Sequence, residues 1–340
     1  MATIKQVSEL AGVSQATVSR VMNGSARVSQ ATREKVDEAM STLGYTPNAF
    51  AQSLASNRSN TVGLIVSELY GPYYGQLMGG LEQVLRENSK YLLIASSHSD
   101  ETMEEEAVEF LLSRRCDALV MHAERLSDAS LDKLAERVPV VCLNRQVASE
   151  RVCSVHLDNI LGGVMATRHL VELGHRHIAC VTGPAWKQDA MDRLTGYHRA
   201  MQEAGVTVED RQVTESQFDE GGGRRAAEKL LGQFPEMTAI VAGDDDIAIG
   251  AIGLLTERGY RVPEDISVIG YDNVPYAPHF SPPLSTIEVP ISDMAGMAAR
   301  HILNTVYSKH QEVKLAFQPQ LVTRKSTAAP RADSAVGTAV

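Results

Sequence analysis

Short apolar runs alternate with helical patterns through most of this chain, and this alternation limits its possible folds more than any other feature. A first set of apolar runs lies at residues 62–66, 91–95, 118–121 and 140–143. A second set lies at residues 178–181, 239–242 and 266–269, and helical patterns occupy residues 188–204, 220–231 and 247–257. Apolar runs of this length indicate parallel strands buried on both faces, with helices as crossovers. The sequence therefore predicts an α/β core of two similar lobes.

The start of the chain has a different pattern, that of short helices joined by turns. Thr3 and Gln6 have the spacing of a capping box, so a first helix is predicted to begin near Thr3. Ile4, Val7 and Leu10 follow at helical spacing and are predicted to form its inner face.

Two more helices are predicted after this one. Gly12 can form a turn and Ser14 can cap a second helix, while Ser29 can cap a third helix that ends at Gly44. The predicted inner faces are formed by Val18, Val21 and Met22 in the second helix and by Val36, Met40 and Leu43 in the third. The outer face of the second helix carries Gln15, Ala16, Ser19 and Arg20. This is the helix-turn-helix pattern, in which the second helix presents its first side chains to base edges in the major groove.

The charge distribution fits a protein that touches nucleic acid at one end. The formal net charge of −10 by itself disfavours a polyanionic partner. However, residues 1–58 carry six Lys or Arg against four Asp or Glu, so this part is +2 and the remainder is −12.

The segment between this head and the lobes is predicted to fold conditionally. Residues 45–48 break the helical pattern, and residues 49–56 are helix-prone but have no apolar partner of their own. Because a helix of about eight residues is marginal in water, it needs a partner, and DNA together with a second copy of the chain could provide one.

Polar side chains recur just after the apolar runs. They are Asn144 and Arg145, Asp158 and Asn159, Asp244 to Asp246, and Asp272 and Asn273. Carboxylates, amides and an Arg can bind neighbouring hydroxyls of a sugar through paired hydrogen bonds. The aromatic rings of Tyr70, Tyr73 and Tyr74 could cover the apolar face of the sugar ring. Asp and Asn at such positions also cap helices, and this alternative stays open for each of them.

Three stretches of the chain resemble the lactose-repressor family of bacterial transcriptional regulators. They are ATIKQVSELAGVSQATVSRVMNG, VSQATREKVDEAMSTLGYTPNAFAQSLA and ISVIGYDN, and the resemblance extends over residues 2–327. It implies that Gln15, Ala16 and Arg20 contact bases and that Leu54 is a minor-groove wedge. It further implies that a second group of residues contacts or borders phosphates: Thr3, Ser14, Thr17, Ser19, Asn23 and Tyr45. Arg27, Asn48 and Ala55 complete the expected DNA-binding set.

The same resemblance implies an architecture and partners. The expected fold is α/β, a two-lobed core like that of periplasmic binding proteins with an all-α helix-turn-helix headpiece, and the chain crosses between lobes near Asp158, Glu288 and Gln318. The expected domains are a headpiece (1–46), a hinge helix and linker (47–60), an effector-binding and dimerisation core (61–327) and a disordered tail (328–340). The expected partners are palindromic double-stranded operator DNA, a small sugar effector and a second copy of the chain. The candidate effector-binding residues are Tyr73, Asn144, Asp158, Arg193, Asp244 and Asp272.

The identity of the effector is less strongly indicated. Residues 115–123 and 157–159 are most similar to galactose-responsive members, so a repressor of galactose or related sugar genes is the first hypothesis. Residues 243–250 resemble regulators of β-glucoside use, so a glucoside or its phosphate remains open, and residues 270–273 resemble purine-responsive members. Asp244 stands where sugar-binding members commonly have Asn. A soluble sugar receptor, a function of another class, would share the lobes but would need an export signal and no headpiece.

Other classes of protein are disfavoured by missing motifs. The sequence has no phosphate loop, dinucleotide fingerprint or nucleophile elbow, so we expect no catalytic residues and no cofactor. His169, His175 and His177 lack further ligands at metal-binding spacing, so no metal is expected. The four cysteines lie in or beside apolar runs and are predicted to be buried thiols. No apolar run is long enough to span a membrane and no secretory signal begins the chain, which favours the cytoplasm, in association with the nucleoid.

Overall fold

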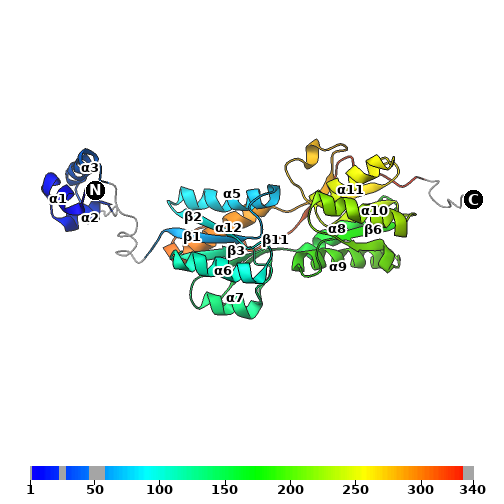
Figure 1. Ribbon diagram of the computed structural model, residues 1–340, viewed down its shortest axis with the longest axis horizontal. Coiled ribbons are helices and arrows are strands. Elements are labelled where there is room, and N and C mark those ends of the chain that lie inside the picture. The colour runs from blue at the N-terminus through cyan, green and yellow to red at the C-terminus, as the bar shows by residue number, and fades with distance from the viewer. Residues whose placement is uncertain (1, 23–27, 46–57, 332–340) are drawn as a thin grey trace, which may run out of the picture. The chain divides into compact units, whose positions relative to one another are not determined.

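The computed structural model describes residues 2–22, 28–45 and 58–331 and divides the chain into two compact units, residues 1–60 and 61–340 (Figure 1). Each unit is described by itself. The predictions for Asn23, Arg27, Asn48, Leu54 and Ala55 lie outside the described residues. Within the described ranges, every helix is too short or too polar to cross a membrane.

The first unit contains α1 (Ile4–Ala11), α2 (Gln15–Met22) and α3 (Gln30–Leu43). The capping box is present, because Gln6 N donates to Thr3 Oγ1 at 3.4 Å and Thr3 N donates to Gln6 Oε1 at 2.9 Å. Gly12 ends α1 and Gly44 ends α3, both in the left-handed region (φ 65° and 58°) that glycine enters without strain. The caps and turns predicted from the sequence are therefore confirmed.

One small apolar core joins the three helices. It is formed by Val7, Val18, Val21, Val36 and Ala39, with Met22, Met40 and Leu43 packed against it. The prediction for Leu10 was wrong, since its side chain is 54% exposed. On a helix with about 100° per residue, position 10 lies at the edge of the face defined by positions 4, 7 and 11.

The second unit contains two six-stranded sheets, one in each lobe (Figure 1). The first sheet has the order β11-β5-β4-β3-β1-β2, and every pairing in it is parallel. Its strands are β1 (Thr61–Val66), β2 (Tyr91–Ser96), β3 (Ala118–Met121), β4 (Val140–Leu143), β5 (Cys153–Leu157) and β11 (Ala316–Phe317). Its helices are α5 (Pro72–Glu87), α6 (Glu101–Ser113), α7 (Asp128–Ala135) and α12 (Ile291–Tyr307).

The second lobe repeats this arrangement. Its sheet has the order β12-β10-β9-β8-β6-β7, in which only the β10–β12 pair is antiparallel among the pairings described. Its strands are β6 (Ile178–Thr182), β7 (Val213–Glu215), β8 (Ala239–Ala242), β9 (Ser267–Asp272), β10 (Ser285–Glu288) and β12 (Gln320–Val322). Its helices are α8 (Asn159–Glu172), α9 (Gln188–Glu203), α10 (Glu220–Gln233) and α11 (Asp245–Glu257), with short 3-10 turns η1 (Asp210–Gln212) and η2 (Ala277–His279).

The strands bury both faces, as their continuous apolar runs predict. In β1, Leu64 and Val66 pack into a core that includes α5 and α12, whereas Ile65 points to the opposite face and packs with residues of α6 and α7. Successive strand side chains alternate between faces, so a strand covered by helices on both sides must be apolar throughout.

The chain passes between the lobes three times. It leaves the first sheet after β5 to form α8, returns after β10 to form α12, and passes from β11 to β12. These crossings lie where the family resemblance implied them, beside Asp158, Glu288 and Gln318. Three segments of chain therefore connect the two lobes and together form an interlobe hinge, which is separate from the hinge helix predicted within residues 47–60.

Part of the chain after residue 327 is ordered and packs against the second lobe. Residues 328–331 were expected to belong to a disordered tail, but they pack against the second lobe. Ala328 O accepts a hydrogen bond from Ser267 Oγ (3.1 Å) and lies 2.8 Å from His175 Nε2, and Arg331 pairs with Asp265 at 2.6 Å. The prediction of a disordered tail was wrong for these four residues, because their partners lie far away in the sequence.

The cysteines are all unpaired. Cys116, Cys142 and Cys180 are buried, whereas Cys153 is only partly buried. Burial raises the pKa of the Cys180 thiol to about 12, so it remains protonated and unreactive.

Candidate functional site

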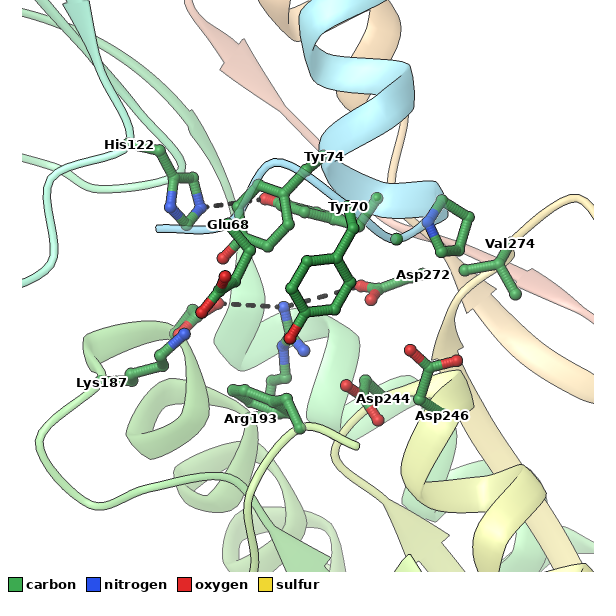
Figure 2. A pocket seen from close by; sticks show the side chains of 15 residues that line it. Glu68, Tyr70, Tyr74, His122, Lys187, Arg193, Asp244, Asp246, Asp272 and Val274 are labelled. Carbon is green, nitrogen blue, oxygen red and sulfur yellow. Dashed lines mark hydrogen bonds and ion pairs between the residues drawn. The ribbon is translucent and has the colours of Figure 1, made fainter. Parts of the chain in front are cut away.

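A cleft lies between the lobes, at the ends of the strands where the loops to the following helices begin (Figure 2). In α/β sheets, ligands bind outside the carboxyl ends of parallel strands because the loops there converge. The cleft is lined from the first lobe by Glu68, Tyr70, Gly71, Pro72, Tyr73, Tyr74 and His122. It is lined from the second lobe by Lys187, Asp189, Arg193, Phe218, Asp244, Asp246, Asp272 and Val274.

Arg193, on α9, is the central polar group of the cleft (Figure 2). Its guanidinium donates to Gly243 O at 2.6 Å, to Asn159 Oδ1 at 3.2 Å and to Asp189 Oδ2 at 3.3 Å. It also lies 3.8 Å from Asp272 Oδ1 and 3.9 Å from the centre of the Tyr271 ring. A planar guanidinium held in this way has a fixed direction, which is what recognition of a ligand oxygen requires.

Close helix packing fixes the position of Arg193. A Cβ atom added to Gly163 on α8 would lie 2.1 Å from the backbone oxygen of Arg193, and one added to Gly196 on α9 would lie 2.2 Å from Ile160 O. Only glycine allows α8 and α9 to approach this closely. Two glycines therefore place the backbone that carries the central arginine.

Carboxylates surround the arginine on the side of the second lobe. Asp244 Oδ1 accepts a hydrogen bond from Ile247 N at 2.7 Å and so caps α11, while Asp246 accepts one from the Tyr276 hydroxyl. Asp272 Oδ1 is buried and has no hydrogen-bond partner among the described residues. Burial, and secondarily the charge of Asp272, raises the pKa of Asp244, and burial likewise raises the pKa of Asp272. Ligand hydroxyls could satisfy these oxygens.

Backbone strain occurs at the same place. Asp272 has φ 103° and Asn144 has φ 56°, a region that residues other than glycine seldom adopt. Such conformations collect at ligand-binding sites, where the surrounding structure holds them. In this chain they end β9 and β4 and turn polar side chains toward the interlobe region.

Aromatic rings line the side of the first lobe. Tyr73, Tyr74 and His122 form a cluster of edge-to-face rings with centres 5.3 to 5.7 Å apart, and Tyr73 Oη lies 3.2 Å from His122 Nε2. Tyr70 overhangs the opening and is 73% exposed. Phe218 adds a ring from the second lobe. Rings on one side and hydrogen-bonding groups on the other suit a ligand with an apolar face and a polar edge.

Polar contacts join the two lobes beside the cleft. Lys187 Nζ donates to Glu124 Oε1 at 2.7 Å, and Asn144 Nδ2 donates to Asp189 Oδ2 at 3.2 Å. Each pair has one member in the first lobe and one in the second. The angle between the lobes is therefore coupled to side chains that line or border the ligand site.

The structure brings most of the predicted effector-binding residues together. Tyr73, Arg193, Asp244 and Asp272 line the cleft, and Asn144 borders it through Asp189. Asp158 is not among them: its exposed carboxylate accepts from Leu161 N at 2.8 Å and caps α8. Asp158 lies outside the lining of this cleft, and the next residue, Asn159, faces Arg193; contact between Asp158 and the effector stays a prediction.

Sequence reasoning missed several lining residues. Lys187 and Asp189 lie at the start of α9, where charged side chains usually face solvent, and Phe218 lies in the loop before α10. Their proximity to the cleft depends on tertiary structure. In the described part of the chain, no three His, Cys, Asp or Glu side chains are arranged to hold a metal ion.

The described part of the headpiece exposes several of the predicted DNA-contacting residues on α2. Gln15, Ala16 and Arg20 are exposed on α2, and the partly buried Thr17 and Ser19 lie between them. Ser14 Oγ accepts from Thr17 N at 3.1 Å, and Thr3 and Tyr45 flank the ends of α1 and α3. Val18 and Val21 face the core, so the opposite face of α2 is left for a partner.

Both parts of the chain match known protein families. Residues 3–48 match the family described as bacterial regulatory proteins, lacI family, and residues 167–327 match the periplasmic binding protein-like domain. The HTH-type transcriptional regulator GalR of Escherichia coli K12 is 40% identical over 332 residues, which cover 97% of each chain.

Two solved structures share the fold along most of the chain. The lac repressor dimer bound to operator and the anti-inducer ONPF is 29% identical with a TM-score of 0.86, covering 96% of this chain and 99% of that one. The transcriptional regulator CelR in complex with cellobiose is 32% identical with a TM-score of 0.71, covering 96% and 100%. The chain therefore belongs to the lacI family of bacterial regulatory proteins and is a DNA-binding transcriptional regulator.

Proposed function

We propose that this protein is a repressor whose hold on operator DNA is weakened by a small sugar bound in the interlobe cleft, with galactose as the first candidate. The similarity to GalR supports galactose. The observation that carries the proposal is the arrangement of Arg193, Asp244 and Asp272 opposite Tyr73 and its neighbouring rings. Carboxylates and a guanidinium bind adjacent hydroxyls, and an aromatic face covers the ring carbons.

Sugar binding would affect DNA binding through the interlobe hinge, by changing the angle between the lobes. A ligand shifts a conformational equilibrium only by its differential affinity for the two states, typically about 1–3 kcal/mol, or about 5–150-fold. By reciprocity, operator DNA must weaken sugar binding by the same factor.

The proposal is tested with the full chain and fluorescently labelled DNA from its own upstream region. Galactose, glucose and a β-glucoside are titrated while fluorescence anisotropy follows DNA binding and calorimetry follows sugar binding. Galactose should bind and release the DNA. If none of the sugars binds, the proposed effector class is wrong.

A β-glucoside is the second candidate, and Asp244 is the reason. It occupies the start of α11 in the cleft, and the stretch around it resembles regulators of β-glucoside use. The same titration separates the two candidates by their relative affinities.

On the DNA side, we propose a homodimer that binds a palindromic operator within the cytoplasmic nucleoid. Residues 1–46 form the headpiece, residues 47–60 the hinge and linker, and the core runs from residue 61 to residue 331. One short reading helix per chain gives few base contacts, so two headpieces at fixed spacing are needed. Residues 1–58 alone should therefore bind the operator far more weakly than the full chain; equal affinity would contradict the dimer.

The hinge helix predicted within residues 47–60 contributes a second kind of DNA contact in this proposal. Leu54 would insert between base pairs in the minor groove, with Asn48 and Ala55 beside it, and Asn23 and Arg27 would contact phosphates. Unstacking costs a few kcal/mol per step and is offset by contacts to the bent duplex. Leu54→Ala should weaken DNA binding and reduce bending without changing sugar affinity. Unaltered bending would remove the wedge from the mechanism.

A further inference from the structure

The charges of the cleft distinguish between the effectors that the sequence left open. The basic side chains that line it are Lys187, Arg193 and His122, and His122 Nδ1 lies 3.5 Å from Oε1 of Glu124. The carboxylates that line it are more numerous: Glu68, Asp189, Asp244, Asp246 and Asp272. Figure 2 shows Asp244 and Asp246 together on one side of the site and Lys187 on the other.

Arg193 and Lys187 are already paired with protein carboxylates. Arg193 contacts Asp189 at 3.3 Å and Asp272 at 3.8 Å. Lys187 Nζ lies 2.7 Å from Oε1 of Glu124, which is 6% exposed and lies outside the lining of the cleft. Neither cation is therefore free to neutralise an anionic ligand unless it abandons a buried carboxylate, which is unfavourable.

Two carboxylates of the cleft lack such compensation. Asp244 accepts from the backbone of Ile247 and Asp246 from the Tyr276 hydroxyl, and neither forms an ion pair in the described part of the chain. Whether ionised or protonated, a carboxyl group can bind sugar hydroxyls, but it offers no positive charge to a phosphate.

We propose that the cleft selects against negative charge, so that it binds an uncharged sugar or an amino sugar and rejects the phosphorylated form of the same sugar. This inference rests on the proposed sugar-responsive function and narrows its ligand class. Specificity of this kind comes from like-charge repulsion against the wrong ligand as much as from contacts to the right one. Lys187 would be the residue that could bind a phosphate, and its pairing with Glu124 is what prevents it.

The test is calorimetry on the full chain with galactose, galactosamine and galactose 6-phosphate, at about pH 6 so that the amine is protonated. Galactosamine should bind at least as tightly as galactose. Galactose 6-phosphate should bind about 30-fold more weakly or worse.

Two variants probe the origin of this selection. Glu124→Gln frees the Lys187 ammonium and should reduce the preference for galactose over its phosphate by about tenfold. Asp246→Asn removes one uncompensated charge while its amide oxygen can still accept from Tyr276, and should reduce the preference severalfold. The matched controls are Glu150→Gln and Asp210→Asn, which change exposed side chains outside the cleft and should leave the preference unaltered.

Failure of this inference differs from failure of the proposed function. The inference is overturned if galactose binds and its phosphate binds within about threefold, or if neither variant changes the preference while both remain folded. If galactose does not bind but glucose or the β-glucoside does, the proposed effector is wrong, and the same comparison between that sugar and its 6-phosphate decides the inference. If galactose does not bind and its phosphate or inorganic phosphate does, both proposals are wrong.

Discussion

Lys187 in the second lobe donates a hydrogen bond to Glu124 in the first lobe, with 2.7 Å between Nζ and Oε1. Their side chains are only 13% and 6% exposed, so water does little to weaken the pair. Glu124 also accepts from Ser99 Oγ at 2.6 Å and lies 3.5 Å from His122 Nδ1. Although burial opposes it, His122 and Lys187 together lower the pKa of Glu124. The carboxylate is therefore ionised, and one ion pair helps to hold the lobes together.

Lys187→Met should loosen this contact between the lobes. Leaving a buried carboxylate without its partner costs about 3–5 kcal/mol, part of which can be relieved if the lobes move apart. Trp186, the single tryptophan of the chain, reports on this region because the Arg125 guanidinium of the other lobe lies 4.6 Å from its ring centre. We expect a lower free energy of unfolding in urea and stronger quenching of tryptophan emission by acrylamide. Lys133→Met, at an exposed position on α7, is the control. Identical quenching in both variants would mean that the Lys187–Glu124 pair does not hold the lobes together.

Arg20→Ala should weaken operator binding by about 1–3 kcal/mol, since an arginine that contacts a guanine with two hydrogen bonds contributes about that much to base discrimination. Arg20→Lys keeps the charge and should retain nonspecific binding while losing part of the discrimination. Both are measured by anisotropy on the operator and on scrambled DNA, with Arg33→Ala on α3 as the control. An equal loss on both DNAs would mean that Arg20 contacts only phosphate.

Arg193→Ala should abolish the response to sugar and leave operator binding intact. It removes the partner of Asp189 and Asp272, so the free energy of unfolding should also fall by about 3–5 kcal/mol. Arg193→Lys should retain more stability than ligand affinity, because lysine keeps the charge but not the fork of donors. Arg199→Ala, an exposed position on the same helix, should change stability by less than about 1 kcal/mol. Calorimetry and urea unfolding check these expectations; unchanged sugar affinity in Arg193→Ala would exclude it from the site.

Asp244→Asn should change which sugar is preferred. The amide oxygen can still accept from Ile247 N, so the cap of α11 and the stability of the lobe should be preserved. The amide always donates two hydrogen bonds as well as accepting, whereas a carboxyl group donates one at most, so a different pattern of hydroxyls is favoured. Calorimetry with galactose, glucose and a β-glucoside should give a changed order of affinities. The same order in both proteins would place Asp244 outside the contact surface.

Asp245 should make the core less stable as the pH rises through neutrality. This carboxyl is fully buried, and burial raises its pKa to about 7 from 3.8 although Thr286 and Val274 donate hydrogen bonds to it. Between these two values the folded chain holds a proton that the unfolded chain has lost, so the stabilisation is full below about pH 4 and is lost as the pH passes about 7. By linkage this contribution is at most about 4 kcal/mol. Urea unfolding from pH 5 to 8 should show the decline, and Asp245→Asn should make it shallower; burial also raises the pKa values of Asp244 and Asp272, so part of the slope should remain. An equal slope in the variant would mean that Asp245 does not contribute.

The sequence by itself determined the local structure, because the signals for it lie within a few residues of one another. Thr3 and Gln6 define the start of α1, Gly12 and Gly44 end helices, and the apolar runs of β1 and β3 predict strands buried on both faces. It did not predict β5, β7, β10, β11 or β12. Cys153–Leu157, for example, lies inside its sheet but contains Ser and His and has no continuous apolar run.

Only the tertiary structure decided which polar residues form the site. Asp158 and Asn159 are adjacent and equally polar, yet the start of α8 commits the first to capping and turns the second toward Arg193. Lys187 meets Glu124 across 63 positions of sequence, and Ala328 meets His175 across 153. The first pair depends on the closure of two lobes connected by three segments of chain, and the second depends on the return of the end of the chain to the second lobe. Local composition does not predict the closure of the lobes, because the free energy of closure comes from surfaces that are buried only when distant segments meet.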